Sequence, residues 1–439
     1  MQNLRQIFTT NIWPKVFFVL VLLLYLLFPN ASHSVDSWGY AGQIKFGVEL
    51  FLPHHLLYSY SGYLLFSLLQ NIGLQVDAMQ FMLFMNGFIA WLCVLILYRI
   101  LLLINGNKKQ AFLLSLIAAF SFGQWRFATE NETYTLPLFF SLLATFYYLK
   151  HFSQISYIQV LLCGFFASLS CLFHQAHIFW FIGFLLGLAL NLSGKNLVNS
   201  LIIYCLPFLI VPLAYILVLR NYYHQDVNIN TLWHFILQDV YSGAAGKPIG
   251  SQHFILGLVN LFRTFFQLHG NMILLFKKNV FYFLPIIVTV VSGIWAFYFM
   301  LKIKPKPYIV SRKNALVFGG IFLAQYFFAV YNVGNAEFMV MLPSLLVIVA
   351  AYFYFKPKIL VLLVLALFSW NFFLGIFPNH FFKYAADEEV AAFTQAQKNI
   401  PFMAEESALL NNIIFYNTGR TPGNIWQSPA KYVEKYGNT

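Results

Sequence analysis

The polar residues with the clearest chemical potential fall into four short clusters, each beside an apolar run. The first cluster contains Asp36, the pair His54-His55 and Tyr58. Trp and Tyr are enriched where membrane helices leave the bilayer, which explains Tyr58 but not a carboxylate in the same loop as two histidines. A carboxylate in such a loop could accept a proton in a transfer reaction. We therefore predict that Asp36 is catalytic, and we include His54, His55 and Tyr58 among the candidate substrate-binding residues.

The second cluster runs from residue 124 to residue 134, between two apolar runs. Arg126 and Glu130 are four residues apart, so they could simply pair on one helical turn. Glu132 then has no local partner, and an unpaired charge at the edge of a bilayer is costly. We predict a catalytic role for Glu132 and substrate-binding roles for Arg126, Glu130 and Tyr134.

The third and fourth clusters are His174-Gln175-Ala176-His177 and the segment around Glu337. A spacing of three puts His174 and His177 on one helix face, where they could bind a metal ion. Without a carboxylate nearby in the sequence, the polar wall of a cavity is the better interpretation. Glu337 could stabilise the start of a helix through its dipole, or it could line the same cavity. The sequence therefore implies no cofactor firmly, and a divalent metal ion remains an alternative.

The elements that must position these residues are membrane helices. Of the 439 residues, 60% are hydrophobic and 9% are charged, whereas soluble domains have about 25% charged residues. This composition excludes a soluble globular domain, a disordered chain, a coiled coil and a disulfide-rich secreted module. The four cysteines lie inside apolar runs, which favours packing over metal binding or disulfides.

Eleven apolar runs predict an all-α polytopic membrane protein with about eleven transmembrane helices. They cover residues 12–28, 81–104, 111–122, 136–149, 157–173, 178–192, 201–219, 280–301, 315–330, 338–355 and 359–376. Two further apolar segments, 54–70 and 254–276, carry polar residues at intervals. We expect these two segments to form helices in the plane of the membrane at its outer face.

The distribution of charge supports this arrangement. If the N-terminus beside Arg5 and Lys15 is cytoplasmic, the inner segments hold 14 of the 26 basic residues and none of the 14 acidic ones. Cytoplasmic loops of membrane proteins are enriched in Lys and Arg, so the net charge of +12 does not indicate a nucleic-acid partner. The pattern predicts a multi-pass protein of the cell (inner) membrane, with its C-terminus and its carboxylates outside.

The chain is expected to have two parts. Residues 1–377 form a transmembrane module, whose first outer loop covers 30–80, and whose first helix is expected to be retained rather than cleaved as a signal peptide. Residues 378–439 are more polar and form a small outer-face segment, in which Asp387, Glu388 and Glu389 are suited to the first turn of a helix.

These motifs together resemble the GT-C glycosyltransferases, and most of all the bacterial relatives of protein O-mannosyltransferases. The matching features are Asp36 after the first span, Pro53-His54-His55 at the start of the next helix, and the stretch from Ala128 through Glu132 to Tyr134. The resemblance covers about the first 190 residues. The sequence has His-His where the family often has Pro-Pro, and it lacks an Asp-Glu pair in the first loop.

The resemblance implies a GT-C-like fold and the transfer of a sugar from a polyprenyl-phosphate-linked donor. The partners would then be the lipid-linked donor, membrane lipid, and an acceptor that is a glycan, lipid or protein. With inversion at the sugar, Asp36 would accept the proton of the acceptor hydroxyl. Arg126 would contact the phosphate, and Glu132, with Glu130, would orient hydroxyl groups.

Two other classes of membrane protein remain alternatives. A lipid-linked oligosaccharide polymerase or ligase would also face outward, and would rely on outer arginines such as Arg220 and Arg263. A secondary transporter would be expected to place ionisable residues at mid-membrane and to contain broken helices in repeated halves.

Overall fold

The computed structural model describes residues 12–153, 156–241, 249–267, 272–303, 305–308, 312–383, 385–397 and 400–428. Within these residues the fold is almost entirely helical, and its few strands have two residues each. Helices occupy all eleven apolar runs that the sequence predicts to cross the membrane. The predicted all-α fold is therefore confirmed.

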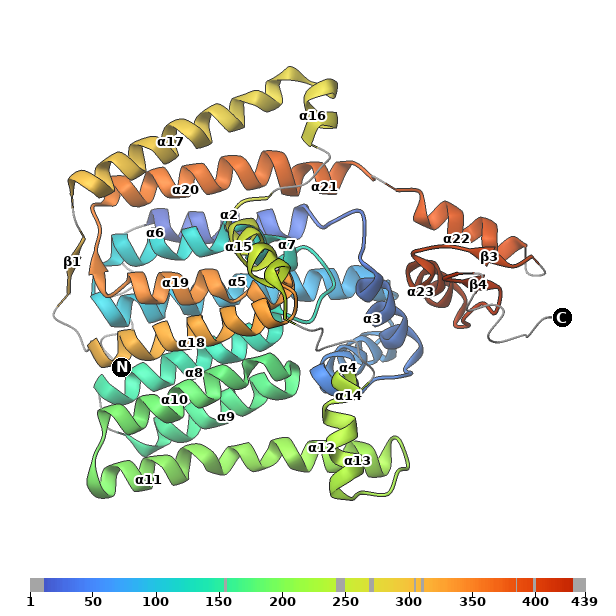
Figure 1. The fold of residues 1–439 in the computed structure, drawn as a ribbon, viewed down its shortest axis with the longest axis horizontal. Coiled ribbons are helices and arrows are strands. Elements are labelled where there is room, and N and C mark those ends of the chain that lie inside the picture. Colours follow the sequence, from blue (N-terminus) through green and yellow to red (C-terminus); the bar gives the residue numbers. More distant parts are fainter. Residues whose placement is uncertain are drawn as a thin grey trace.

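The long helices lie side by side along the longest axis of the molecule (Figure 1). They are α2 (Ile12–Leu27), α5 (Ala78–Asn105), α6 (Lys108–Ala119), α8 (Thr135–Ser153), α9 (Tyr157–Phe173), α10 (Ile178–Asn191), α11 (Gly194–Cys205) with α12 (Ile210–Asn221), α17 (Phe283–Lys302), α18 (Arg312–Tyr331), α19 (Leu342–Ala350) and α20 (Pro357–Asn371). The short helix η3 (Leu206–Leu209) joins α11 to α12 in one continuous rod.

Among the described residues, five helices are long and apolar enough to cross a membrane on their own. A sixth span results if α6 and α7 (Phe122–Ala128), which meet at a bend of 68°, are counted together. Other apolar helices, including α9, have only 10–17 residues. About 20 residues are needed to cross the hydrocarbon layer, so the fold is that of a multi-pass membrane protein in which several apolar helices are short.

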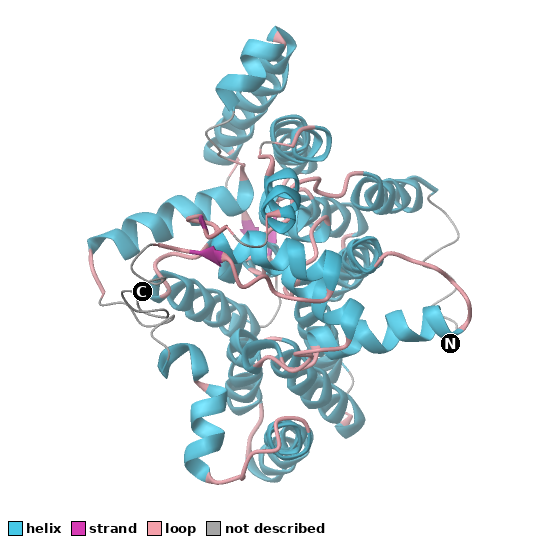
Figure 2. Ribbon diagram, turned by 90° about the vertical axis from the view of Figure 1, so that its right-hand side faces the viewer, coloured by secondary structure: helices cyan, strands magenta, loops and turns pink. Residues whose placement is uncertain are grey.

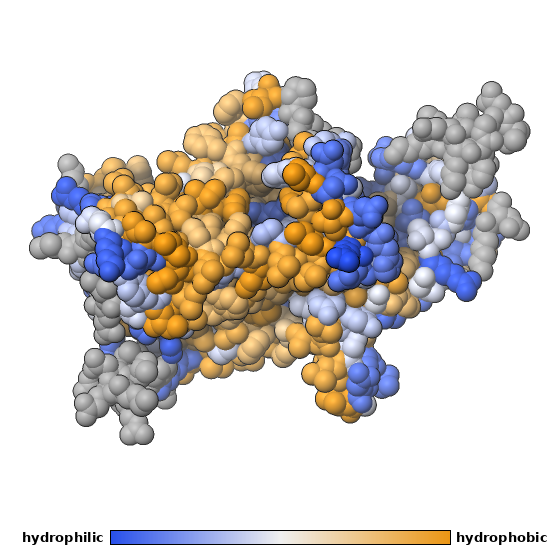
Figure 3. Space-filling model, turned by 90° about the horizontal axis from the view of Figure 1, so that it is seen from below, coloured by the Kyte–Doolittle hydropathy of each residue, from blue (hydrophilic) through white to orange (hydrophobic). Residues whose placement is uncertain are grey.

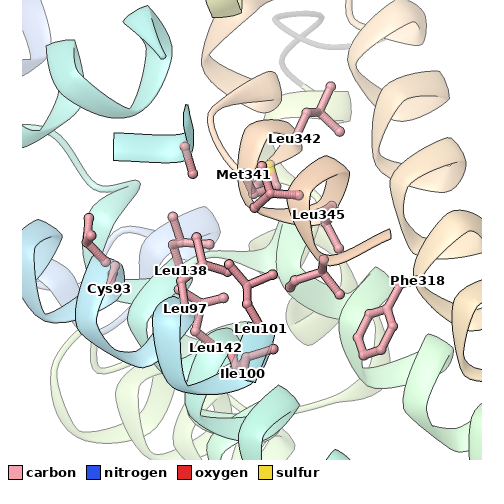
Figure 4. Packing of buried hydrophobic residues seen from close by; sticks show 14 of the residues in the cluster. Cys93, Leu97, Ile100, Leu101, Leu138, Leu142, Phe318, Met341, Leu342 and Leu345 are labelled. Carbon is pink, nitrogen blue, oxygen red and sulfur yellow. The ribbon is translucent and has the colours of Figure 1, made fainter. Parts of the chain in front are cut away.

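Packing between α5, α8, α18 and α19 forms part of the apolar core (Figure 4). Leucine and isoleucine side chains of α5 interdigitate with those of α8 and α19, and Phe318 of α18 closes one side. Close approach of backbones also holds the bundle together. A Cβ atom on Gly164 of α9 would lie 2.2 Å from the carbonyl oxygen of Tyr204 in α11, so no larger residue fits there.

One end of the bundle is basic. Here β1 (Lys306–Pro307) pairs antiparallel with β2 (Phe353–Tyr354), and Gln110 Nε2 donates to the carbonyl oxygen of Phe353 at 2.7 Å. Lys313 Nζ donates to the carbonyl oxygen of Leu190 at 2.7 Å. The segments that the sequence assigns to the inner side therefore converge on one end of the bundle (Figure 1).

The opposite end carries short helices and the acidic residues. It is built from α3 (Val35–Phe46), η1 (Pro53–His55), α4 (Tyr58–Asn71), α13 (Ile229–Ile236), α14 (Gln238–Tyr241), α15 (Ser251–Phe265), α16 (Met272–Lys278), η5 (Ala336–Met339), α21 (Phe377–Phe381), α22 (Asp387–Ala396) and α23 (Ser407–Thr418). Figure 2 views the molecule from this end, so the long helices are seen end-on. Both segments predicted not to cross the membrane lie here: α4 follows η1, and Asn260 of α15 donates to the carbonyl oxygen of Gly334 at 2.7 Å.

An apolar surface separates the two ends (Figure 3). It includes exposed large side chains such as Leu186, Ile202 and Leu213. A soluble protein rarely exposes so large an apolar area to water. The surface between the ends is therefore suited to contact with lipid.

The C-terminal segment packs on the first helix of the acidic end. Asn412 Nδ2 of α23 donates to the carbonyl oxygen of Val35 at 2.9 Å, and Lys45 Nζ donates to the carbonyl oxygen of Tyr416 at 3.0 Å. Within this segment, β3 (Phe402–Met403) pairs in parallel with β4 (Ile425–Trp426) and so joins the residues before and after α23. The helix α3 is thus held between the bundle and the C-terminal segment.

Candidate active site at the acidic end

Four carboxylates from three separate parts of the chain lie near enough at the acidic end for their charges to act on Asp36 or Glu132. Asp36 comes from α3, Glu130 and Glu132 from the loop between α7 and α8, and Glu337 from η5. The side chains of Glu130 and Glu132 are buried, with exposed fractions of 1% and 3%. Buried carboxylates are uncommon unless they are paired or functional. We call Asp36, Glu130, Glu132 and Glu337 the acid cluster.

The start of α3 is fixed to this cluster. Ser34 is the N-cap residue: its Oγ accepts the backbone N–H of Ser37 at 3.0 Å. The same hydroxyl donates to Oε1 of Glu132 at 2.6 Å. Asp36 lies in the first turn of α3, where the helix dipole favours a negative charge. Glu132 therefore holds the helical turn that carries Asp36.

The side chain of Asn131 fastens the loop to α3 and α4. Its Nδ2 donates to the carbonyl oxygen of Ser37 at 2.8 Å, and its Oδ1 accepts from Tyr58 OH at 2.8 Å. In return Ser37 Oγ donates to the carbonyl oxygen of Asn131 at 2.9 Å. The segment 34–58 and the segment 126–134 thus meet directly, although about ninety residues separate them in the sequence.

Asn86 supports the same loop from inside α5. Its Nδ2 donates to the carbonyl oxygens of Glu130 and Glu132 at 2.8 and 2.9 Å, and its Oδ1 accepts from Thr135 Oγ1 at 3.0 Å. The prediction from sequence missed Asn86, because it lies in a run interpreted only as a membrane span. The sequence did contain a signal for this role: Asn86 is a carboxamide within an apolar run, and a buried amide needs hydrogen-bond partners.

Arg126 and Glu130 form the ion pair that their spacing allows. Arg126 Nε lies 3.0 Å from Oε2 of Glu130. The Glu130 side chain is buried, whereas 40% of the Arg126 side chain is exposed. The exposed part of the guanidinium leaves room for a further anionic partner, for which its planar fork of donors is suited.

Burial and mutual repulsion change the proton affinities of two carboxylates in the acid cluster. Burial, together with the charges of Glu130 and Glu337, raises the pKa of Glu132 well above its ordinary value. Burial, with the charges of Glu337 and Glu130, also raises the pKa of Asp36. Glu132 is thereby favoured in its protonated form, and Asp36 is a stronger base than an aspartate of ordinary pKa.

Tyr134 links the loop to η5 and to the hairpin between α9 and α10. Its hydroxyl donates to Oε2 of Glu337 at 3.0 Å, and its ring lies 5.2 Å from that of His174. Asn335, not Glu337, is the N-cap residue of η5, so the Glu337 carboxylate is directed to Tyr134. Burial lowers the pKa of His174 well below its ordinary value, so this imidazole is neutral.

The four histidines of the sequence clusters have different surroundings. His55 is buried, and its Nε2 lies 3.0 Å from Tyr40 OH. Tyr40 lies in α3, one helical turn after Asp36. His54 Nδ1 instead lies 3.3 Å from Oδ2 of Asp239 in α14. His177 is fully buried, and its Nδ1 bonds the hydroxyl of Ser141 at 2.7 Å. His54 and His177 are thus each engaged by a partner outside the acid cluster.

The structure therefore brings most of the predicted site residues together. The exceptions are His54 and His177, whose partners lie outside the acid cluster. Asp36, Glu130, Glu132 and Glu337 form the acid cluster, with Arg126, Tyr134, Tyr58, His55 and His174 around it. Tyr40 also lies among the residues around the acid cluster, because burial and the charges of Glu132 and Asp36 raise the pKa of its hydroxyl.

No protein-family model matches the sequence, and no curated protein matches it. Among solved structures, the apo oligosaccharyltransferase of Archaeoglobus fulgidus is similar, with a TM-score of 0.51 and 12% identity over 96% of this chain. The same enzyme in complex with Zn and sulfate gives a TM-score of 0.48 at 12% identity. It covers 95% of this chain and 58% of that one.

The chain has a GT-C-like membrane fold. The expectation of this fold is thereby confirmed. At 12% identity the likeness concerns the fold, and the chain spans 61% of the length of the apo enzyme. The narrower resemblance to relatives of protein O-mannosyltransferases stays a prediction.

The described part of this chain contains no group of three or more His, Cys, Asp or Glu arranged to hold a metal ion. His174 and His177 have ring centroids 6.3 Å apart, and Ser141 occupies Nδ1 of His177. Three or four ligands around one point are required for zinc.

Proposed function

We propose that this protein is an integral-membrane glycosyltransferase that moves a sugar from a polyprenyl-phosphate-linked donor to an acceptor hydroxyl. The observation that carries this proposal is the acid cluster on a GT-C-like fold, with Asp36 held in place by the bond between Ser34 and Glu132. In this proposal residues 1–377 form the catalytic module and residues 378–439 an outer-face segment.

Asp36 acts as the base in the proposed reaction. The acceptor oxygen forms a bond to the anomeric carbon while the bond from that carbon to the phosphate oxygen breaks. The proton of the acceptor hydroxyl passes to Asp36, and the lipid phosphate leaves with the electron pair. Attack from the face opposite the phosphate inverts the anomeric centre. A raised pKa makes Asp36 a stronger base for this proton.

The other residues bind and orient. Arg126 pairs with the phosphate through its exposed guanidinium, because a phosphate leaving group needs a cation rather than a proton donor. Protonated Glu132 holds α3 through Ser34. Glu337, His174 and Tyr134 form the wall that orients the hydroxyl groups of sugar and acceptor.

A lipid-linked oligosaccharide as the donor is the second candidate. The observation that favours it is the likeness in fold to an oligosaccharyltransferase. The position of the acid cluster at one end of the bundle does not favour a secondary transporter, whose substrate site lies near the middle of the membrane.

The proposed location is the cell (inner) membrane, with the acidic end outside. The positive-inside rule supports it, because the basic segments converge on the opposite end. The two chain ends, residues 1–11 and 429–439, lie outside the described residues. A cytoplasmic N-terminus and an outer C-terminus therefore remain part of the proposal.

The decisive test is sugar transfer by the purified protein in nanodiscs, from a radiolabelled polyprenyl-phosphate sugar to a mixture of hydroxyl-bearing lipids and glycans. Wild-type protein should release polyprenyl phosphate and label the acceptor fraction, and the Asp36→Asn variant should not. Asp226→Asn is the matched control, because Asp226 is an exposed carboxylate at the same end. Undiminished transfer by Asp36→Asn would contradict the proposal.

A further inference from the structure

Two adjoining hollows lie beside the start of α5, away from the acid cluster. The first is a polar cavity of about 520 Å³, lined by Trp38 of α3, Asp77 at the N-cap of α5, Gln80 of α5, and residues of the C-terminal segment. Trp38 is two positions after Asp36, so the cavity is on the other face of α3. The second hollow is an apolar groove of about 630 Å³ between α4 and α5.

The polar cavity has the composition of a site for hydroxyl groups. Its walls offer the carboxylates of Asp77 and Glu388 and the side chains of Asn30, Gln80 and His380. Trp38 and Tyr416 add two aromatic rings whose centroids are 5.1 Å apart. Carboxylates and amides bond hydroxyl groups, while aromatic rings pack on the apolar face of a sugar ring.

The charges of the cavity do not favour an anion. Lys383 is engaged by Glu388, with Nζ 2.8 Å from Oε1. Burial lowers the pKa of His33, so this imidazole adds no positive charge at neutral pH. Asp77 accepts hydrogen bonds from Tyr416 OH and from the backbone N–H of Gln80. The lining therefore has two carboxylates and one lysine, and this lysine is already paired.

The apolar groove continues from the cavity. Its walls are side chains such as Leu65, Leu68, Phe81 and Phe84, and Leu68 is 56% exposed. The apolar lining would be unfavourable in contact with water. Leu65 and Leu68 of α4 and Phe84 of α5 are exposed large apolar side chains, so the groove is open to lipid.

Asp77 and Gln80 line both hollows. A single ligand can therefore place a polar head in the cavity and an apolar chain in the groove, with the linkage beside the Asp77 carboxylate. A phosphate at that linkage would be repelled by Asp77. We propose that the two hollows together bind a lipid with an uncharged, hydroxyl-rich head group, that is, a neutral glycolipid.

This site is distinct from the proposed donor site, whose ligand carries a phosphate. The proposal does not depend on glycosyl transfer, since binding alone defines the site. Failure of the transfer assay and failure of the binding assay are therefore separate results.

The test uses the full-length protein in phosphatidylcholine nanodiscs with two photoactivatable lipids. One is a monoglucosyl diacylglycerol and the other a phosphatidylglycerol, with the same diazirine in the same acyl chain. Cross-linked peptides are mapped by mass spectrometry. The glucosyl lipid should label the region 65–85 about tenfold more than the anionic lipid. Equal labelling by the two lipids would overturn the assignment of a neutral head group.

Substitutions distinguish binding in this groove from general contact between the protein surface and lipid. Leu68→Trp should fill the groove and abolish the selective labelling. Leu64→Trp is the matched control: Leu64 is on the same helix and 49% exposed, and it is not among the residues that line the groove. Asp77→Asn keeps a helix cap and removes the charge, so labelling by phosphatidylglycerol should rise. Equal loss of labelling in the Leu64 and Leu68 variants would refute the site.

Discussion

The hydroxyl of Ser34 donates a hydrogen bond of 2.6 Å to Oε1 of Glu132, a residue 98 positions later in the chain. The same hydroxyl caps α3 by accepting the N–H of Ser37. Glu132 therefore orients the first turn of α3, in which Asp36 lies. This contact suggests a division of roles, with Asp36 as the base and Glu132 as the residue that positions it.

Replacement of Asp36 by Asn should abolish most of the catalytic rate and leave donor binding intact. Loss of a general base typically lowers the rate by ~10²–10⁴-fold. The measurement is kcat for sugar transfer, together with the Kd of the polyprenyl-phosphate donor. Arg126→Ala should instead weaken donor binding as well as rate. A similar loss of donor affinity in both variants would argue against separate roles.

The pH dependence of transfer should reflect the raised pKa of Asp36. A base is active when deprotonated, so activity is present above its pKa and is lost as the pH falls through it. The ordinary value for an aspartate is 3.8, and burial raises the pKa of Asp36 above this. A profile of kcat/KM against pH should show an acidic limb above pH 3.8. A limb at or below that value would disagree with a base whose pKa is raised by its surroundings.

Glu132→Gln should make the protein more stable at alkaline pH. The folded-state pKa of Glu132 is raised, so the stability it contributes is fully present below the ordinary value of 4.5 and is lost as the pH rises through the raised pKa. A tenfold difference in proton affinity between the folded and unfolded states corresponds to ~1.4 kcal/mol. The difference in Tm between variant and wild type, measured in detergent, should therefore grow from pH 5 to pH 8. A constant difference would exclude a titrating Glu132.

Asn86→Leu should destabilise the fold. The substitution leaves Thr135 and the carbonyl oxygens of Glu130 and Glu132 without the partner that Asn86 provides. A buried polar group that loses its partner costs about 1–3 kcal/mol. The control is Asn196→Ala, because Asn196 is exposed on α11 and surface changes cost about 0.5 kcal/mol or less. Equal thermal shifts in the two variants would contradict the role given to Asn86.

Reporter fusions test the proposed orientation. A fusion after Lys109 should report the cytoplasm, because Lys109 lies near the start of α6 at the basic end. A fusion after Thr439 should report the outer side. Both reporters on one side would disprove the assigned orientation.

The helices were predictable from sequence because apolar runs are long and charges are few. Each of the eleven predicted runs contains a helix, and the position of the basic residues identified which ends lie together. The bend of 68° between α6 and α7 was not predicted. It occurs at Ser121, whose backbone is extended and whose Oγ donates to the carbonyl oxygen of Ala118, and the chain beyond it carries the loop with Glu130 and Glu132.

The acid cluster was only partly predictable. Unpaired charges in a membrane protein are costly, which made Asp36 and Glu132 stand out in the sequence. Their surroundings were not accessible in the same way. Asn86 bonds residues 44 and 46 positions away, and Tyr134 bonds Glu337 at a separation of 203 positions. Contacts at such separations leave no periodic pattern in the chain.

The bond between Tyr134 and Glu337 also has a consequence for biosynthesis. A ribosome adds about 5–20 residues per second, so the 203 residues between these partners take about 10–40 s to appear. During that interval α3, α5 and the loop with Glu132 have already emerged, but η5 has not. The nascent protein must therefore enter the membrane with an incomplete acid cluster, and its last carboxylate arrives only after three quarters of the chain has been translated.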